Sequence, residues 1–220
     1  LTRRDVSVTL VQRGAEVLST VEPDLGAFVH DTLTDNGVTV LTDETITEIQ
    51  ATEAGYHLIG STTDDAFDFV LVVVGVRPNS ELLVNAGATV TDQNAVVVDD
   101  QMRTNLPDVY AAGDLVQTKH RLLGATYLPL GTTAHKQGRV AGANIVGRES
   151  HFAGIIGSQV LRAFDVIVAR TGLLPNEATA AGFTAITTTA VVDDHKGYFP
   201  GAESEGRLDG YQLLCKKHVN

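Results

Sequence analysis

The stretch TNLPDVYAAGD, residues 104–114, best indicates how this chain folds. An apolar run from Val109 to Ala112 predicts a short buried strand, which Gly113 and Asp114 then end with a carboxylate. Gly-Asp is also ordinary turn chemistry. In open α/β sheets, however, ligands bind at the carboxyl ends of the strands. The stretch therefore predicts an α/β fold in which Asp114 holds a sugar or polyol hydroxyl.

Composition and charge restrict the possible functions. The 220 residues are 43% hydrophobic and 20% charged, which suits one or two globular domains. The net charge of −11 argues against a nucleic-acid partner, because phosphate backbones need a basic face. Cys215 is the single cysteine, so an internal disulfide and a multi-cysteine metal site are excluded. The seven histidines show no zinc-motif spacing, and we expect no metal site.

The beginning of the chain and its apolar runs bear on its location. The longest unbroken apolar run ends at Val74 and is far shorter than a membrane span, so we expect no membrane partner and a cytoplasmic protein. The chain opens at Leu1, without Met, and enters a strand almost at once. We therefore expect that a preceding segment has been lost, including any targeting sequence.

Hydrophobic periodicity predicts alternating strands and helices in the first half. Val6–Val11 is a β-branched strand, and a helical face over residues 23–35 ends at Asn36-Gly37. The unbroken run FVLVVVG, residues 69–75, predicts a strand buried on both faces, as in a parallel sheet. Other strands are predicted within residues 38–52 and 55–68, and at 94–104 and 108–114.

The second half is predicted to contain more helix. A short helix is expected over Glu81–Ala86, and a longer one over Thr132–Val146. The longer helix has a stripe of small residues, which indicates that something packs closely against that face: Ala134, Gly138, Ala141 and Gly142. Beyond residue 149 the pattern changes to strand, short helix and strand, which predicts a separate α+β unit.

Five motifs, in order along the chain, resemble the pyridine nucleotide-disulfide oxidoreductase superfamily. They are VVVGVRPN (72–79), TNLPDVYAAGD (104–114), YLPLGTTAHKQGRVAGANIVG (127–147), FAGIIGSQVLRAFDVIVARTGL (152–173) and YFPGA (198–202). Within it, the chain is most similar to NADH oxidases, NADH peroxidases and coenzyme A-disulfide reductases. The resemblance implies parts of two Rossmann-like domains followed by the start of an α+β dimerisation domain. Residues 1–77 would be the C-terminal half of an NAD(P)-binding domain. Residues 78–149 would be the C-terminal segment of an FAD-binding domain, and residues 150–220 the N-terminal part of a dimerisation domain.

The resemblance implies an FAD site. A carboxylate at the position of Asp114 would accept a hydrogen bond from a ribityl hydroxyl, beside Gly113. A helix begins after Pro129-Leu130-Gly131, and its amino terminus would lie beneath the flavin, where Thr132 or Thr133 could cap it. The alternative is a helix that packs tightly on a sheet through its glycines.

The resemblance also implies an NAD(P) site at Gln12, Arg13 and Gly75. Rossmann domains usually have Asp or Glu at the end of the second strand, where it binds the ribose 2′-hydroxyl. Gln12 does not repel a 2′-phosphate and Arg13 could pair with one, which favours NADPH or the use of both nucleotides. The alternative is that Gln12 serves NADH through its amide while Arg13 is a solvated surface charge.

Two further residues were considered for catalysis. The resemblance implies that Tyr198 reaches the active site of a partner subunit and donates a proton there, although packing within the dimer is the competing interpretation. Cys215 lies outside every matching motif, and residues 203–220 do not resemble the family. We therefore expect Cys215 to be a non-catalytic thiol. The resemblance implies that the redox cysteine of the family precedes this region and lies outside this chain.

The predicted function is part of a flavoprotein that passes hydride from NAD(P)H to FAD. Electrons would then reach a disulfide, persulfide, peroxide or dioxygen through that cysteine. The full-length protein would be a homodimer acting on a small-molecule or thiol/disulfide substrate. No G-x-G-x-x-G loop occurs, so we expect an internal fragment that is inactive alone. The alternatives are a ferredoxin- or rubredoxin-reductase-like flavoprotein without the cysteine, and a non-catalytic dinucleotide-binding module.

Overall fold

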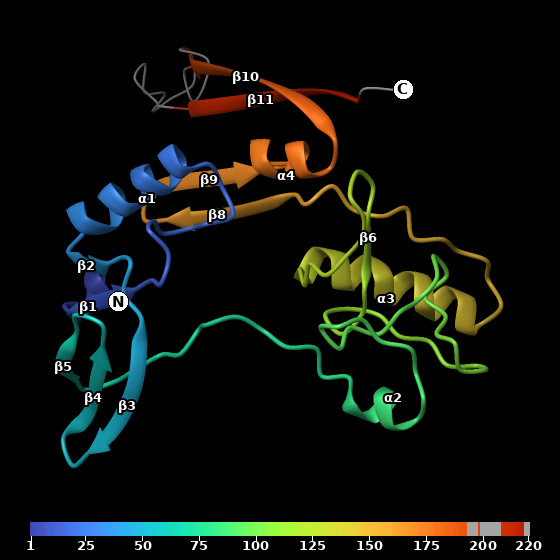
Figure 1. The fold of residues 1–220 in the computed structure, drawn as a ribbon, viewed down its shortest axis with the longest axis horizontal. Helices are drawn as coiled ribbons and strands as arrows, with labels where there is room; N and C mark the ends of the chain where they lie inside the picture. Colours follow the sequence, from blue (N-terminus) through green and yellow to red (C-terminus); the bar gives the residue numbers. More distant parts are fainter. Residues whose placement is uncertain (193–197, 199–207, 218–220) are drawn as a thin grey trace. The chain divides into compact units, whose positions relative to one another are not determined.

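The computed structural model describes residues 1–192, 198 and 208–217 (Figure 1). The chain divides into two units by its internal contacts. The first unit combines Leu1–Val72 with Gln159–Asn220, and the second unit is Val73–Ser158.

The first unit begins with a parallel β-α-β motif. A short 3₁₀ turn, Thr2–Arg4, precedes β1 (Val8–Val11), and α1 (Pro23–Asp35) leads to β2 (Val38–Leu41). Val8 pairs with Val38 and Val11 with Leu41. Two parallel strands need a crossover of this kind, and Pro23 at the first turn of α1 is well suited to start it. Gly37, at φ 79°, follows the C-cap residue of α1, which confirms the predicted Asn36-Gly37 stop.

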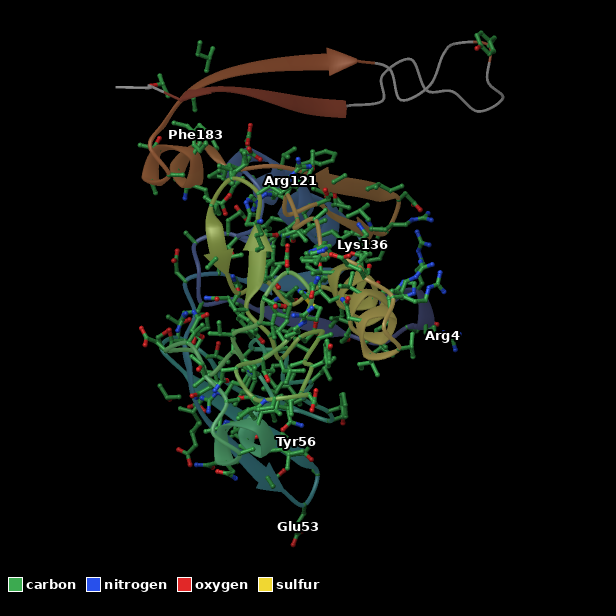
Figure 2. All side chains as sticks on the ribbon, turned by 90° about the vertical axis from the view of Figure 1, so that its right-hand side faces the viewer. Arg4, Glu53, Tyr56, Arg121, Lys136 and Phe183 are labelled. Atoms are coloured by element: carbon green, nitrogen blue, oxygen red, sulfur yellow. The ribbon has the colours of Figure 1, made fainter. Side chains whose placement is uncertain are left out.

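An antiparallel sheet follows. It consists of β3 (Ile46–Thr52), β4 (Gly55–Gly60) and β5 (Asp64–Phe67), in that spatial order. Figure 2 shows Glu53 at the tip of the turn between β3 and β4. Most side chains of β3 are exposed, whereas Leu58 of β4 is buried.

The remaining elements of the first unit come from the end of the chain. They are the antiparallel pair β8 (Gln159–Ala163) and β9 (Val166–Arg170), helix α4 (Pro175–Ala180), and the antiparallel pair β10 (Phe183–Val192) and β11 (Leu208–Lys217). This order of strand pair, helix and strand agrees with the predicted α+β pattern after residue 149.

The core of the first unit joins its two sequence segments. Val17, Val21 and Val29 are buried together with Val168 of β9. Partly buried neighbours complete the cluster: Leu10, Leu18, Leu25, Leu33, Val40, Leu161, Ala163 and Val166. Full burial of one such side chain contributes about 1.5–3 kcal/mol. The apolar face predicted for α1 therefore packs on β8 and β9.

The second unit contains two helices and one short hairpin. Its elements are α2 (Glu81–Asn85), β6 (Thr118–His120), β7 (Gly124–Thr126) and α3 (Gly131–Ile145). Two apolar clusters hold it together. One of them consists of Ala88, Val96, Ala111 and Val116, and the other of Met102, Val140, Ala141 and Phe152.

The limits of α2 and α3 confirm the predicted helices at 81–86 and 132–146 to within one residue at each end.

Three strand predictions were wrong. Residues 69–75 form no strand, and their side chains are mostly exposed, with Val74 91% exposed. Residues 94–104 and 108–114 form isolated bridges instead of strands, among them Val96 with Val116 and Arg103 with Tyr110. A β-branched run becomes a strand only when neighbouring backbone pairs with it, and among the described residues none does so at 69–75.

Candidate cofactor site

The loop that carries Asp114 is attached to α3 by one side chain. The N–H of Gly113 donates a hydrogen bond to Oε1 of Gln137, 3.0 Å away. Nε2 of Gln137 donates in turn to Oγ1 of Thr118 in β6, at 3.2 Å. Gln137 is fully buried, at 0% exposure. A single amide thus joins the end of the 104–114 stretch, α3 and β6.

Glycine is required at position 113. Its φ is 93°, a left-handed conformation that residues with a Cβ adopt at a cost. A Cβ built there would lie 3.6 Å from the Cβ of Ala134, in ordinary contact with the first turns of α3. The backbone at residue 113 therefore runs close to the beginning of that helix.

Asp114 is exposed, and its side chain makes no hydrogen bond with the described residues. Its carbonyl oxygen accepts a hydrogen bond from the hydroxyl of Tyr127, at 2.8 Å. Burial raises the pKa of the Tyr127 hydroxyl, and the nearby Asp114 carboxylate raises it further. The Asp114 carboxylate is thus held beside Tyr127 while remaining available to a ligand.

The amino terminus of α3 differs in detail from the prediction. Leu130 occupies the N-cap position, and no side chain caps the helix, so capping by Thr132 or Thr133 was wrong. The N–H groups of Thr133 and Ala134 both donate to the carbonyl of Leu130, each at 2.9 Å. A leucine offers no side-chain oxygen, and the two threonines lie inside the first turn.

The first turn of α3 is partly open. Gly131 and Thr132 are exposed, whereas Thr133 is buried. Among the described residues, no backbone hydrogen bond engages the N–H of Gly131 or Thr132. Such N–H groups carry the positive end of the helix dipole. The two glycines of the small-residue stripe are also open, because a Cβ at Gly138 or Gly142 would meet nothing within 4 Å, whereas Ala141 of the same stripe is buried.

The structure brings some of the predicted residues together. Gly113, Asp114, Leu130, Gly131, Thr132 and Thr133 all lie in the second unit, where Gly113 contacts Gln137 and approaches Ala134 of α3. Gln12 and Arg13 lie in the first unit, and Gly75 lies in the exposed segment at the start of the second. Tyr198 is 74% exposed, and the rest of its YFPGA motif lies outside the described residues.

Gln12 directly follows β1. Its N–H donates to the carbonyl of Leu41 at 2.8 Å, and its carbonyl accepts from the N–H of Glu44 at 3.1 Å. Arg13 is exposed and makes no hydrogen bond or ion pair with the described residues. The uncharged amide and the guanidinium are therefore placed at the carboxyl end of β1, where the sequence predicts nucleotide binding.

Two contributors were missed from the sequence. Gln137 was not singled out, although it is four residues after Thr133 and four before Ala141 on the buried side of α3, where a polar residue calls for a partner. Tyr127 belongs to the YLPLGTTAHKQGRVAGANIVG motif, but the motif does not indicate its role. Its contact with Asp114 joins residues 13 positions apart across a turn-rich region, and no periodicity predicts it.

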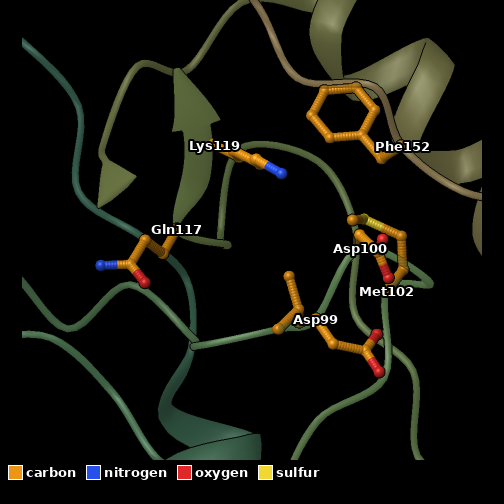
Figure 3. A pocket seen from close by; sticks show the side chains of 7 residues that line it. Asp99, Asp100, Met102, Gln117, Lys119 and Phe152 are labelled. Carbon is orange, nitrogen blue, oxygen red and sulfur yellow. The ribbon is translucent and has the colours of Figure 1, made fainter. Parts of the chain in front are cut away.

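A separate cavity of about 200 Å³ lies elsewhere in the second unit (Figure 3). It is lined by Val98, Asp99, Asp100, Met102, Gln117, Lys119 and Phe152. None of the predicted FAD residues lines it. Among the described residues there is also no His, Cys, Asp or Glu cluster suited to a metal ion, and no helix long and apolar enough to cross a membrane.

Comparisons with known proteins agree with the motifs. Residues 1–138 match the family model described as pyridine nucleotide-disulphide oxidoreductase. The NAD(P)H sulfur oxidoreductase (CoA-dependent) of Pyrococcus furiosus is 31% identical over 200 residues, which cover 90% of this chain and 45% of that protein. Other relatives are named coenzyme A disulfide reductase, from Staphylococcus epidermidis, and NADH oxidase, from Methanocaldococcus jannaschii.

Solved structures give the same result. An NAD-dependent persulfide reductase from A. fulgidus superimposes with a TM-score of 0.86 at 30% identity, covering 96% of this chain and 39% of that one. An engineered water-forming NADPH oxidase bound to NADPH gives a TM-score of 0.83 at 26% identity, covering 91% and 45%. The chain spans less than half the length of each of these proteins. These findings show that the chain belongs to the pyridine nucleotide-disulfide oxidoreductase family, whose members are FAD/NAD(P) proteins of the Rossmann type.

Proposed function

We propose that this chain is part of an enzyme that passes hydride from NAD(P)H to FAD and then reduces a disulfide, persulfide, peroxide or dioxygen. The observation that carries the proposal is the bond between the Gly113 N–H and Gln137, which brings the Asp114 loop to α3. Relatives named for reduction of sulfur compounds and for NADH oxidation support this class of reaction. A cysteine outside this chain would pass the electrons on.

The residues of the second unit fit a flavin. FAD supplies the hydride-accepting chemistry when bound. The left-handed Gly113 lets the backbone come close to a ligand, and the Asp114 carboxylate would accept a hydrogen bond from a ribityl hydroxyl. Gly131 and Thr132, with Leu130 and Thr133 on either side, would present N–H groups that stabilise negative charge on the reduced ring.

In the first unit, Gln12 and Arg13 would bind the adenosine end of the nucleotide. Gly75, which belongs to the second unit, would be an NAD(P)-binding residue as the resemblance implies. We propose that NADPH is used at least as well as NADH, because Arg13 can pair with a 2′-phosphate. The engineered NADPH oxidase supports this, since its substitutions include an aspartate changed to alanine and the next residue, an alanine, changed to arginine. Gln12-Arg13 has the same combination of an uncharged residue and arginine.

The larger assembly is part of the same proposal. Residues 1–77 would belong to the NAD(P)-binding domain, 78–149 to the FAD-binding domain and 150–220 to a dimerisation domain. The full-length protein would be a cytoplasmic homodimer in which Tyr198 donates a proton in the partner's active site. Its 74% exposure in the single chain is compatible with a contact made by a second subunit.

Absorbance spectroscopy of the full-length protein tests the proposal. We expect a flavin spectrum that NADPH or NADH bleaches under anaerobic conditions and that coenzyme A disulfide, polysulfide or oxygen restores. A protein that binds nucleotide but retains no flavin would instead be a dinucleotide-binding module. A flavin that is bleached but restored only by a ferredoxin or rubredoxin would identify the reductase-like alternative.

A further inference from the structure

The loop from β1 to α1 contains a partly buried carboxylate that is hydrogen-bonded within the protein. Oε1 of Glu16 lies 2.8 Å from Nδ1 of His30, on α1. The same oxygen accepts a hydrogen bond from the N–H of Val17, at 3.0 Å. The side chains of Glu16 and His30 are each 29% exposed. The charge of Glu16 is therefore already engaged within the first unit.

Gly26 provides the space for this arrangement. A Cβ at position 26 would lie 2.8 Å from Cγ of Glu16 and 2.9 Å from the carbonyl oxygen of Val17. Both distances are shorter than real Cβ contacts allow. Glycine inside a helix costs about 1 kcal/mol relative to alanine, so its use in the first turn of α1 has a physical reason. It admits the Glu16 side chain beneath the helix.

The other charged side chains near this end of β1 and β2 differ from Glu16 in their exposure and in their partners. The Glu44 carboxylate is 2% exposed and accepts hydrogen bonds from the backbone and hydroxyl of Thr62. Asp43 is exposed, and its N–H donates to the carbonyl of Gly14 at 3.0 Å. Glu22 occupies the N-cap position of α1, where its side chain makes no capping hydrogen bond, and it is half-buried. Arg13 is the cation of this loop, and it has no ion pair among the described residues.

We propose that His30, the Val17 N–H and Gly26 act together to keep Glu16 away from the nucleotide, so that Arg13 can receive a 2′-phosphate. This inference rests on the nucleotide site proposed above. An acidic residue near the ribose accepts its 2′-hydroxyl but repels a 2′-phosphate. Glu16 is four residues past Gln12 and would compete with Arg13 if it turned outward. Glu16 is thus a specificity-determining residue because of where its carboxylate is held.

Calorimetry on the full-length protein tests this with adenosine 2′,5′-bisphosphate and AMP as probes. His30→Ala releases the Glu16 carboxylate and should weaken bisphosphate binding about fivefold, the effect expected of one exposed like charge at about 4 Å. It should not weaken the binding of AMP, because AMP has a 2′-hydroxyl that a carboxylate can accept. Glu16→Gln alone should change the affinity by less than about twofold. The double variant Glu16→Gln/His30→Ala should regain the wild-type affinity, because no carboxylate remains to be released.

Asp43→Asn provides the matched control. It removes a charge of the same sign beside Gly14, and its effect should be the same with or without His30. If Glu16→Gln alone strengthens bisphosphate binding by more than about twofold, or if the double variant stays weak, the inference is wrong.

The nucleotide site itself is tested by a different comparison. If the wild type does not prefer the bisphosphate to AMP and Arg13→Ala changes neither affinity, the proposed NADPH site fails. The Glu16–His30 contact is then judged by a double-mutant cycle in thermal unfolding. If the two substitutions had additive effects on thermal unfolding, Glu16 and His30 would not interact. The inference that His30 holds the Glu16 carboxylate would then be wrong as well.

Discussion

The N–H of Gly113 and Oε1 of Gln137 are joined by a 3.0 Å hydrogen bond that holds the Asp114 loop against the second turn of α3. The amide of Gln137 has no exposure to water, so both of its polar atoms depend on protein partners. Gly113 and Thr118 are those partners. The position of the candidate flavin-binding loop therefore depends on a residue that would not itself touch the cofactor.

Gln137→Leu should destabilise the second unit. The substitution keeps an apolar side chain in place but leaves the Gly113 N–H and the Thr118 hydroxyl without their partner, which costs about 1–3 kcal/mol. Denaturant unfolding measures the loss, and flavin retention in the full-length protein should fall with it. Lys136→Leu, on the exposed side of the same helix (Figure 2), is the control and should stay within about 0.5 kcal/mol of wild type. Equal losses in both variants would contradict the role given to the hydrogen bond.

Gly113→Ala should also destabilise, for a different reason. An alanine at φ 93° costs about 1–2 kcal/mol of backbone strain, although its Cβ would fit beside Ala134. Gly138→Ala is the matched glycine substitution, because its Cβ would meet nothing within 4 Å and helix propensity should make it stabilising by about 0.5–1 kcal/mol. Thermal unfolding of the two variants should therefore shift in opposite directions.

Asp114→Asn should lower the pKa of Tyr127. Burial raises the pKa of Tyr127 above its ordinary value of 10.0, and the nearby Asp114 carboxylate raises it further because it disfavours the tyrosinate, so removal of that charge brings the pKa down. The contribution from burial remains, so the pKa should stay above the ordinary value. Ultraviolet titration of tyrosinate, compared with Tyr127→Phe to identify the signal, measures the change. Asp108→Asn, at another exposed position of the same stretch, should leave this titration unaltered.

His151 should make the stability of the second unit depend on pH. Its ring lies between Glu149 and Asp100, at 3.2 and 3.1 Å, and hydrogen bonds to these carboxylates raise the pKa of His151 above its ordinary value of 6.5. A raised pKa in the folded state contributes stability that is fully present below pH 6.5 and is lost as the pH rises through the folded-state value.

The variant His151→Gln tests that dependence. The difference in unfolding free energy between wild type and variant should be largest in mildly acidic solution and should shrink toward alkaline pH. His135→Gln changes an exposed histidine of α3 that makes no hydrogen bond with the described residues, and it serves as the control for the substitution itself. A difference for His151→Gln that grew with pH would contradict the assignment of the two carboxylates.

Helices were predicted well from the sequence because their signals are local. The apolar face of α1 and the Asn36-Gly37 stop lie within one continuous segment, and so do the limits of α3. Strands at 69–75, 94–104 and 108–114 were predicted from composition alone. Their formation depends on backbone partners that are distant in sequence, which a β-branched run does not specify.

The candidate site was only partly predictable. Asp114 and the start of α3 could be linked through the motifs they resemble, but not through spacing, since 17 positions separate Asp114 from Gly131. The role of Gln137 follows from burial, and that of Gly26 follows from the path of Glu16 beneath α1. Both depend on tertiary contacts that no single segment of sequence encodes.

The exposed apolar segment Phe69–Val76 affects how this polypeptide behaves in solution. Apart from Gly75 it is apolar, most of its residues are β-branched, and its backbone pairs with none of the described residues. Such a segment can template intermolecular cross-β association. Concentrated preparations of the 220-residue chain should consequently form thioflavin-positive aggregates, and a lysine in place of Val73 should delay them.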